Sequence, residues 1–409
     1  MAINYIWTSL IVISFLVASV KLILFGDTEV WNKMLQSLFD SSKDAFSFAL
    51  NLTGVLTLFL GLLKVAEKAG MVQLLAKLMN PFFSRIFPGI PKGHPSTVHI
   101  LMNFSANMLG LDNAATPLGL KAMQSLQELN PDKEKASNAQ IMFLTLNASG
   151  LTIIPISIIS ARAAKGAANP ADVFIPILIA TYCSSLAGLL AVSIYQKINL
   201  LNKIVFTYLL ATSSLVGLAI FYFSNLSTEQ LNTQSSLFSS IILFSIIVLF
   251  IVLGVIKKIN VYDAFIEGAK EGFESAIKII AYMVAIFVAI SMFRSCGAMD
   301  IIMNALKFIL LSVSADVRFV DALPTALMKP LSGTGARGMM LDAMQTYGAD
   351  SFTARLSCIF QGAADTTFYI LSVYLGYVGI KNSRYALATC LIADLAGVIA
   401  AVCVTYIFF

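Results

Sequence analysis

Repeated windows of about 20 apolar residues constrain this chain more than any other feature of its sequence. A helix of about 20 residues crosses a hydrocarbon core about 30 Å thick. Only 12% of the 409 residues are charged, about half the share that is usual in soluble domains. A soluble enzyme, a disordered chain and a nucleic-acid-binding protein are therefore disfavoured, and we expect an all-α polytopic membrane protein. About nine full transmembrane helices are expected, near residues 4–25, 46–65, 139–161, 173–195, 202–223, 237–256, 276–293, 353–375 and 385–408.

Two further regions are apolar but interrupted. Residues 94–123 contain NFSANMLGLDNAATPLG and residues 323–344 contain KPLSGTGARG, so each has two short apolar arms around a polar middle. Lipid cannot satisfy the backbone polar groups of an irregular segment, which must be buried in protein or line a cavity. We therefore expect two re-entrant hairpins. Amphipathic segments, typical of interfacial helices, precede them at residues 71–87 and 298–313.

The same order of elements occurs twice along the chain. LGLKAM at 118–123 resembles MMLDAM at 339–344, and SLAGLLAV at 185–192 resembles DLAGVIAAV at 394–402. This ordered series indicates an internal duplication. The copies are expected at residues 1–198 and 199–409.

The number of predicted spans gives the relative orientation of the two copies. Five spans separate the start of the first copy from the start of the second, and an odd number inverts the second copy in the membrane. An inverted structural repeat with broken helices is typical of secondary transporters, which bind solute near the membrane midplane. Basic loop residues such as Lys133, Lys197 and Lys381 favour a cytoplasmic N-terminus and an external C-terminus in a bacterial cytoplasmic (inner) membrane.

Polar residues inside the interrupted regions and the helices that follow them are the candidate solute ligands. An ionisable residue at membrane depth is costly and is a functional candidate by default. Asp365 is the sharpest candidate, with Lys329 or Arg337 as its expected partner, while Asp394 ranks second. The alternative for each uncharged residue is that it only joins helices by hydrogen bonds. The candidates are Asn103, Asn107, Asn113, Thr116, Asn147, Ser149 and Thr152 in the first copy and Lys329, Ser332, Thr334, Arg337, Gln361, Asp365, Thr366 and Thr367 in the second.

No pattern in the sequence favours covalent chemistry, a metal site or a resident cofactor. His94 and His99 are five residues apart and have no neighbouring cysteine or carboxylate pair, unlike zinc ligands. There is no nucleophile and base arrangement, phosphate loop or dinucleotide fingerprint. The five cysteines form no C-x-x-C pair and are interpreted as small buried apolar residues.

Several long motifs resemble known bacterial families. HPSTVHILMNFSANMLGLDNAATPLGLKAMQSL and NASGLTIIPISIISAR resemble the spore maturation protein A family. MFRSCGAMDII, KPLSGTGARGMMLDAMQTYGADSF and QGAADTTFYILSVYLGYVGIKNSRYAL resemble the spore maturation protein B family. The chain therefore resembles a fusion of both, with two nucleoside-recognition (Gate) domains. The resemblance implies a relation to concentrative nucleoside transporters and ferrous-iron transporters, whose cores use hairpins and broken helices in inverted repeats.

We expect a secondary transporter of a small polar solute that is anionic, zwitterionic or nucleoside-like. The cationic pair Lys329 and Arg337 favours such a solute over a bare cation, and Asp365 is a candidate for coupling transport to H⁺ or Na⁺. The expected partners are this solute and the lipid bilayer, with no nucleic acid, and a homo-oligomer stays open. The alternative function is a non-transporting scaffold or receptor with a Gate fold, linked to spore maturation or envelope physiology. An intramembrane enzyme is disfavoured.

Overall fold

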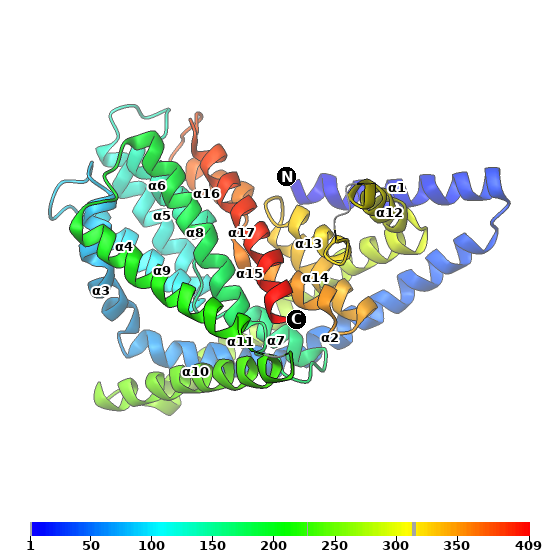
Figure 1. The fold of residues 1–409 in the computed structure, drawn as a ribbon, viewed down its shortest axis with the longest axis horizontal. Helices are drawn as coiled ribbons and strands as arrows, with labels where there is room; N and C mark the ends of the chain where they lie inside the picture. Colours follow the sequence, from blue (N-terminus) through cyan, green and yellow to red (C-terminus); the bar gives the residue numbers. More distant parts are fainter. Residues whose placement is uncertain (1, 227, 313–315) are drawn as a thin grey trace.

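The computed structural model describes residues 2–226, 228–312 and 316–409, and this part of the chain is helical, without β-strands. Figure 1 shows the helices in chain order. The first half of the chain contains eight of them, which end before the polar segment at Lys197. They are α1 (Ala2–Phe25), α2 (Glu29–Lys68), α3 (Met71–Ile86), α4 (Pro95–Leu109), α5 (Asp112–Leu129), α6 (Asn138–Ala148), α7 (Ile156–Ala164) and α8 (Phe174–Gln196).

The second half repeats the order of these elements. A long helix, a short amphipathic helix, a helical hairpin, a helix in two pieces and a final apolar helix follow one another in both halves. Its elements are α9 (Lys203–Ser224), α10 (Thr228–Ile256), α11 (Val261–Ser295), α12 (Ala298–Ser312), η1 (Val320–Ala322), α13 (Leu323–Met328), α14 (Gly333–Tyr347), α15 (Phe352–Ala363), α16 (Thr367–Tyr377) and α17 (Ala386–Phe408).

Six described helices are long and apolar enough to cross a membrane. A seventh candidate is the bent pair formed by the end of α11 and α12, which meet at an angle of 65°. The 22-residue helix α9 buries only Val205 and Phe223 against the rest of the chain. So large an exposed apolar surface is stable in lipid rather than in water. The chain is therefore a multi-pass membrane protein, although the predicted number of nine spans is not confirmed.

Both interrupted regions are helical hairpins, as predicted. In the first, Gly110 directly follows the end of α4 and has a φ of 73°, and α5 begins two residues later. In the second, Ser332 precedes α14 and its Oγ accepts a hydrogen bond from the Gly335 N–H. Glycine adopts such a left-handed φ without strain, and serine is a preferred residue before a helix. That these hairpins are re-entrant stays a prediction.

The helices that follow the hairpins are both broken near their middle. The first break separates α6 from α7 over residues 149–155 and contains Gly150 and Pro155. The second separates α15 from α16 over residues 364–366, where the backbone is extended. Backbone groups in these short segments have no partner in a continuous helix, so they are available to other elements or to a ligand.

Equivalent helices of the two halves pack against each other in antiparallel pairs. Along α2 and α11, Lys68 pairs with Glu267 and Ser37 contacts Ser295, so the helices run in opposite directions. Along α8 and α17, a Cβ at Gly188 would lie 3.1 Å from Ala393. A Cβ at the matching glycine of α17, Gly397, would lie 3.1 Å from Ser184. These close approaches hold the halves together at their centre.

Two long helices begin earlier than the apolar windows that predict them. Against the predicted windows at 46–65 and 276–293, α2 begins at Glu29 and α11 at Val261. The added residues include charged ones that form ion pairs along or between these helices, such as Glu29 with Lys33 and Glu271 with Lys64. A hydropathy window does not detect such segments, because charged residues lower its average. Ion pairs between these charged side chains nevertheless stabilise the helix.

Candidate functional site

A cavity of about 720 Å³ lies where the two hairpins approach the two helix breaks. The first hairpin contributes Asn107 and Gly110 to its wall, and the second contributes Lys329, Gly333 and Arg337. The helices α2 and α11 close another side. This volume is within the range of pockets for small molecules. In Figure 1 the surrounding elements α2, α7, α11, α14 and α15 meet near the centre of the molecule.

Each hairpin contacts the helix break of its own half in the same way. In the first half, the Ile153 N–H donates to the Met108 carbonyl at 2.8 Å. In the second half, the Phe368 N–H donates to the Pro330 carbonyl at 3.0 Å. Backbone groups freed by the breaks are thus satisfied by the hairpin tips. These bonds fix the position of both tips beside the cavity.

The two breaks also touch each other across the centre. The Asp365 N–H donates to the Ala148 carbonyl at 2.7 Å. Gly150 has a φ of +60°, and a Cβ there would lie 2.7 Å from the Asp365 nitrogen. A side chain at this position would both strain the backbone and push the second break away.

Six of the predicted residues line the cavity. Asp365 is exposed there, whereas Lys329 is only 8% exposed. The Gln361 Nε2 lies 3.5 Å from the Gly333 carbonyl, and its buried Oε1 has no hydrogen-bond partner among the described residues. A buried amide oxygen without a donor is costly, so a polar solute could supply one. The six are Asn107, Thr152, Lys329, Arg337, Gln361 and Asp365.

Other predicted residues lie outside the cavity lining and bond to protein groups. Asn147 accepts a hydrogen bond from Asn107 at 2.9 Å and donates to the Phe143 carbonyl at 2.8 Å, so it positions a residue that does line the cavity. Asn103 donates to the Ala115 carbonyl at 2.8 Å. Ser149 donates to the Leu146 carbonyl at 2.9 Å. These bonds match the alternative role of joining helices.

The remaining predicted residues are dispersed. The hydroxyl of Thr367 donates to Asp394 at 2.7 Å. The Thr366 N–H donates to the side chain of Asp365 at 2.7 Å. The other four do not line the cavity in the described structure: Ser332 caps α14, Thr334 is exposed, Thr116 is half-buried, and the Asn113 side chain lies outside the described residues.

Sequence reasoning missed three charged residues at the cavity. Lys64 and Glu67 of α2 and Glu271 of α11 contribute to its lining. The Lys64 ammonium lies 3.0 Å from Glu271 and 3.4 Å from Glu67. The sequence places Lys64 at the end of an apolar window, where it reads as a loop residue. Its three-residue spacing to Glu67 was the available signal for a paired helix face.

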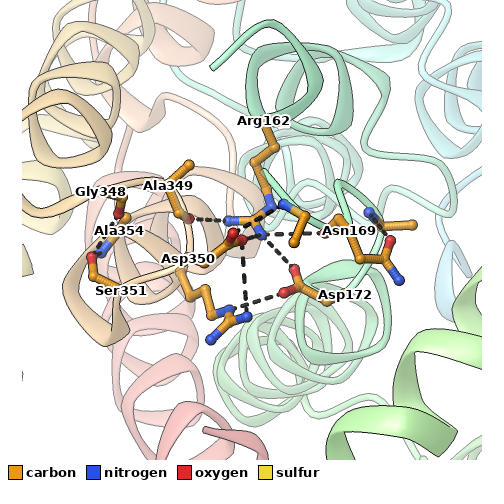
Figure 2. A network of polar contacts seen from close by, with 11 residues as sticks. Arg162, Asn169, Asp172, Gly348, Ala349, Asp350, Ser351 and Ala354 are labelled. Carbon is orange, nitrogen blue, oxygen red and sulfur yellow. Dashed lines mark hydrogen bonds and ion pairs between the residues drawn. The ribbon is translucent and has the colours of Figure 1, made fainter. Parts of the chain in front are cut away.

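A second polar network lies away from the cavity and was also missed (Figure 2). The Arg162 side chain is fully buried, and its guanidinium lies 2.8 Å from Asp172 and 3.0 Å from Asp350. It also donates to the Ala349 carbonyl at 2.6 Å. Arg355 completes the network, 2.9 Å from Asp172. The network joins the loop after α7 to the loop before α15.

Lys165 lies close to this network and is held by aromatic rings. Its ammonium is 5.3 Å from the ring centre of Phe48 and 5.9 Å from that of Phe287. Burial lowers the pKa of Lys165, while the charges of Asp44 and Asp342 oppose this shift. The residue follows α7 directly, so α2, α7 and α11 are tied together at this end.

Comparisons with known proteins place both halves in one family. The Gate family, described as nucleoside recognition, matches residues 49–165 and 276–381, which together exceed half of the chain. Spore maturation protein B of Bacillus subtilis (strain 168) is 48% identical over 158 residues, covering 38% of this chain and 86% of that protein. Spore maturation protein A of the same organism is 37% identical over 188 residues, covering 46% of this chain and 92% of that protein.

No solved structure matches the chain with statistical significance. The family assignment therefore rests on sequence. The two matched regions coincide with the two copies of the hairpin and helix break. One Gate match ends just after α7 and the other just after α16, so each includes a hairpin and a break. The chain belongs to the Gate (nucleoside recognition) family, and it is consistent with a fusion of homologues of spore maturation proteins A and B.

Proposed function

We propose that the chain is a secondary transporter that moves a small polar solute through the central cavity. The observation that carries this proposal is the meeting of two hairpin tips and two helix breaks around a cavity of about 720 Å³. Helix breaks in such a place expose backbone dipoles to a solute, and an interface between two repeats allows alternating access. The names of the two relatives refer only to spore maturation, so they assign no substrate.

The arrangement of the two halves supports an inverted repeat. Equivalent helices α8 and α17 pack antiparallel, and the matching glycines Gly188 and Gly397 each lie at the same contact. Reciprocal contacts of this kind are typical of a two-fold relation. The two-fold axis that relates two antiparallel helices runs perpendicular to them. Because the helices cross the membrane, this axis would lie in the membrane plane. The proposal includes nine spans, a cytoplasmic N-terminus and a bacterial inner-membrane location.

The cavity chemistry favours a charged solute. Lys329, Arg337 and the paired Lys64 supply positive charge, while Asp365, Glu67 and Glu271 supply negative charge. Gln361 offers a buried amide oxygen without a partner among the described residues. An anionic or zwitterionic solute pairs with such a set. Among the described lining residues none is aromatic, so stacking of a nucleobase has no platform here. A small anion or zwitterion is therefore favoured over a nucleoside.

The alternative of a non-transporting scaffold or receptor predicts a closed and dry centre. The charged lining and the exposed carboxylate of Asp365 argue against that prediction. A scaffold would gain nothing from Gln361 Oε1 being buried without a partner. Transport is therefore the function that this geometry supports best.

A thermal-shift screen of small anions and zwitterions on the purified full-length protein tests the proposal. A ligand at 100 times its Kd stabilises a protein by about 2.7 kcal/mol. We expect one solute class to raise the unfolding temperature of the wild type and to lose this effect in Asp365→Asn. Asp300→Asn is the matched control, because Asp300 is an exposed aspartate outside the cavity. Absence of any stabilising solute, or equal stabilisation of all three proteins, contradicts the proposal.

A further inference from the structure

Asp394 is a buried carboxyl group in the middle of α17 beside the break between α15 and α16. Its side chain is 6% exposed, and its Oδ2 accepts a hydrogen bond from the Thr367 hydroxyl at 2.7 Å. Its Oδ1 has no hydrogen-bond partner among the described residues. An ionised carboxylate with a bare oxygen is costly in the interior of a membrane protein. This oxygen is therefore a place where a proton gains free energy by binding.

Other neighbours of Asp394 favour its ionised form instead. Thr367 is the first residue of α16, and the residue before it, Thr366, makes no side-chain capping bond. The positive end of this helix dipole therefore lies next to the Asp394 carboxylate. Burial favours the neutral form, whereas the hydroxyl and the helix end favour the charged form. A carboxyl group with one hydrogen-bonded oxygen and one unpartnered oxygen among the described residues can bind a proton at the second oxygen and release it again.

The charged neighbours of Asp394 connect it to the cavity. Lys329 attracts the ionised carboxylate and Asp365 repels it, and both of these residues line the cavity. Cys390 is the titratable neighbour on α17 itself. An anionic group bound at Lys329 would cancel part of the positive potential at Asp394. Solute binding and proton binding would then favour each other, because such coupling is reciprocal.

We propose that Asp394 binds the coupling proton of the transport cycle, an inference that rests on the proposed transport function. In each cycle one proton from the solvent forms an O–H bond at Oδ1 and removes one negative charge. The same bond breaks when the proton leaves to the other side, and no other covalent bond changes. The Thr367 hydroxyl keeps its bond to Oδ2 in both forms.

A proton fits this position better than a sodium ion. Sodium needs a shell of several oxygen ligands, whereas a proton needs one lone pair. Around Asp394 Oδ1 the described residues provide no polar partner within hydrogen-bond distance. Asp365 is exposed to the cavity and keeps contact with the solute in this arrangement.

Infrared difference spectroscopy of the purified full-length protein over a pH series tests the proposal. It detects proton binding directly, through the carbonyl band of the protonated carboxyl group. We expect the carbonyl band of a protonated carboxylic acid in the wild type, absent in Asp394→Asn and retained in Asp300→Asn. Among the described residues, the Thr367 hydroxyl is the only hydrogen-bond donor to the carboxylate, and Thr367→Val removes it. The midpoint of the band should therefore move upward by about one to two pH units. This second variant keeps the test informative if Asp394→Asn does not fold.

Four outcomes overturn the proposal. A band that persists in Asp394→Asn assigns the proton to another group. Stabilisation by Na⁺ over choline at equal ionic strength, lost in Asp394→Asn, assigns a sodium ion instead. No band at all, with solute stabilisation intact in the thermal-shift screen, overturns proton coupling and leaves transport standing. A band without any stabilising solute overturns the transport function and, with it, the coupling.

Discussion

At the scale of single residues, Arg162 is the charge whose loss should cost most. It is fully buried between Asp172 and Asp350. Removing one partner of a buried ion pair leaves an uncompensated charge and costs about 3–5 kcal/mol. We therefore expect Arg162→Met to lower the free energy of unfolding by about this amount, measured by chemical unfolding in detergent.

Arg318 provides the matched control for Arg162. Its ion pair with Asp316 is exposed, with side-chain exposures of 59% and 47%. Exposed pairs are worth about 0–1 kcal/mol, so Arg318→Met should change stability little. Equal effects of the two substitutions would show that the network in Figure 2 is not a stabilising centre.

Gly150 is the residue that allows the two helix breaks to touch. An added Cβ would lie 2.7 Å from the Asp365 nitrogen, at a φ of +60°. Gly70 is left-handed, with a φ of 83° and a ψ of 24°, and a Cβ there would meet only the Gln73 side-chain oxygen at an ordinary 3.5 Å. Gly70→Ala should lose about 1–2 kcal/mol of stability through backbone strain alone, and Gly150→Ala should lose more because of the added clash. Equal losses in thermal unfolding would contradict the contact between the breaks.

The sequence predicted three of the six charged residues that line the cavity in the described structure, but not their partners. Asp365, Lys329 and Arg337 line the same cavity, because the Gly- and Ser-rich segments that carry them form the hairpin and break. The bond between Thr367 and Asp394 spans 27 residues and depends on how α16 meets α17. No local pattern specifies such a contact, so Asp394 ranked second at the sequence level.

At the scale of elements, glycines set the distance between α2 and α11. A Cβ at Gly268 would lie 2.4 Å from the Leu60 carbonyl, whereas Gly217 of α9 has nothing within 4 Å. We expect Gly268→Leu to separate the two helices and to lower the unfolding temperature. Gly217→Leu should leave it nearly unchanged, because it points into open space. A stable Gly268→Leu protein would contradict this packing.

The hairpins and breaks were predictable as elements, but the full lengths of α2 and α11 were not. Gly110, Gly150 and Pro155 interrupt apolar sequence, and irregular backbone follows from their conformational preferences. The polar start of α2 and the charged start of α11 lack an apolar window. The charged start of α11 pairs with Lys64 and Lys68 at the end of α2, which belong to the other half of the chain.

At the scale of the whole molecule, the repeated order of elements was visible in sequence and the cavity was not. Short motifs such as those around Gly188 and Gly397 mark equivalent positions, and these glycines pack at one contact. The cavity depends on four segments far apart in the chain, namely two hairpin tips and two breaks. Their approach results from tertiary packing, which hydropathy does not encode.

The proposed topology makes a final prediction about which loops share a side of the membrane. The helix α8 runs from Phe174 to Gln196, and α17 packs against it in the opposite direction. The loop with Ala168 should therefore lie at one end of this pair, and the loop with Lys381 should lie at the other. With nine spans and a cytoplasmic N-terminus, Ala168 is external and Lys381 is cytoplasmic.

Labelling of single cysteines in right-side-out membrane vesicles checks this topology, after replacement of the five native cysteines. An impermeant maleimide should label Ala168→Cys directly and Lys381→Cys only after permeabilisation. Both positions are exposed, and the ion pair of Lys381 with Glu134 is at the surface, so neither change should disturb the fold. The reverse pattern would contradict the orientation alone. Labelling of both from one side would contradict the antiparallel crossing of α8 and α17, and with it the inverted repeat.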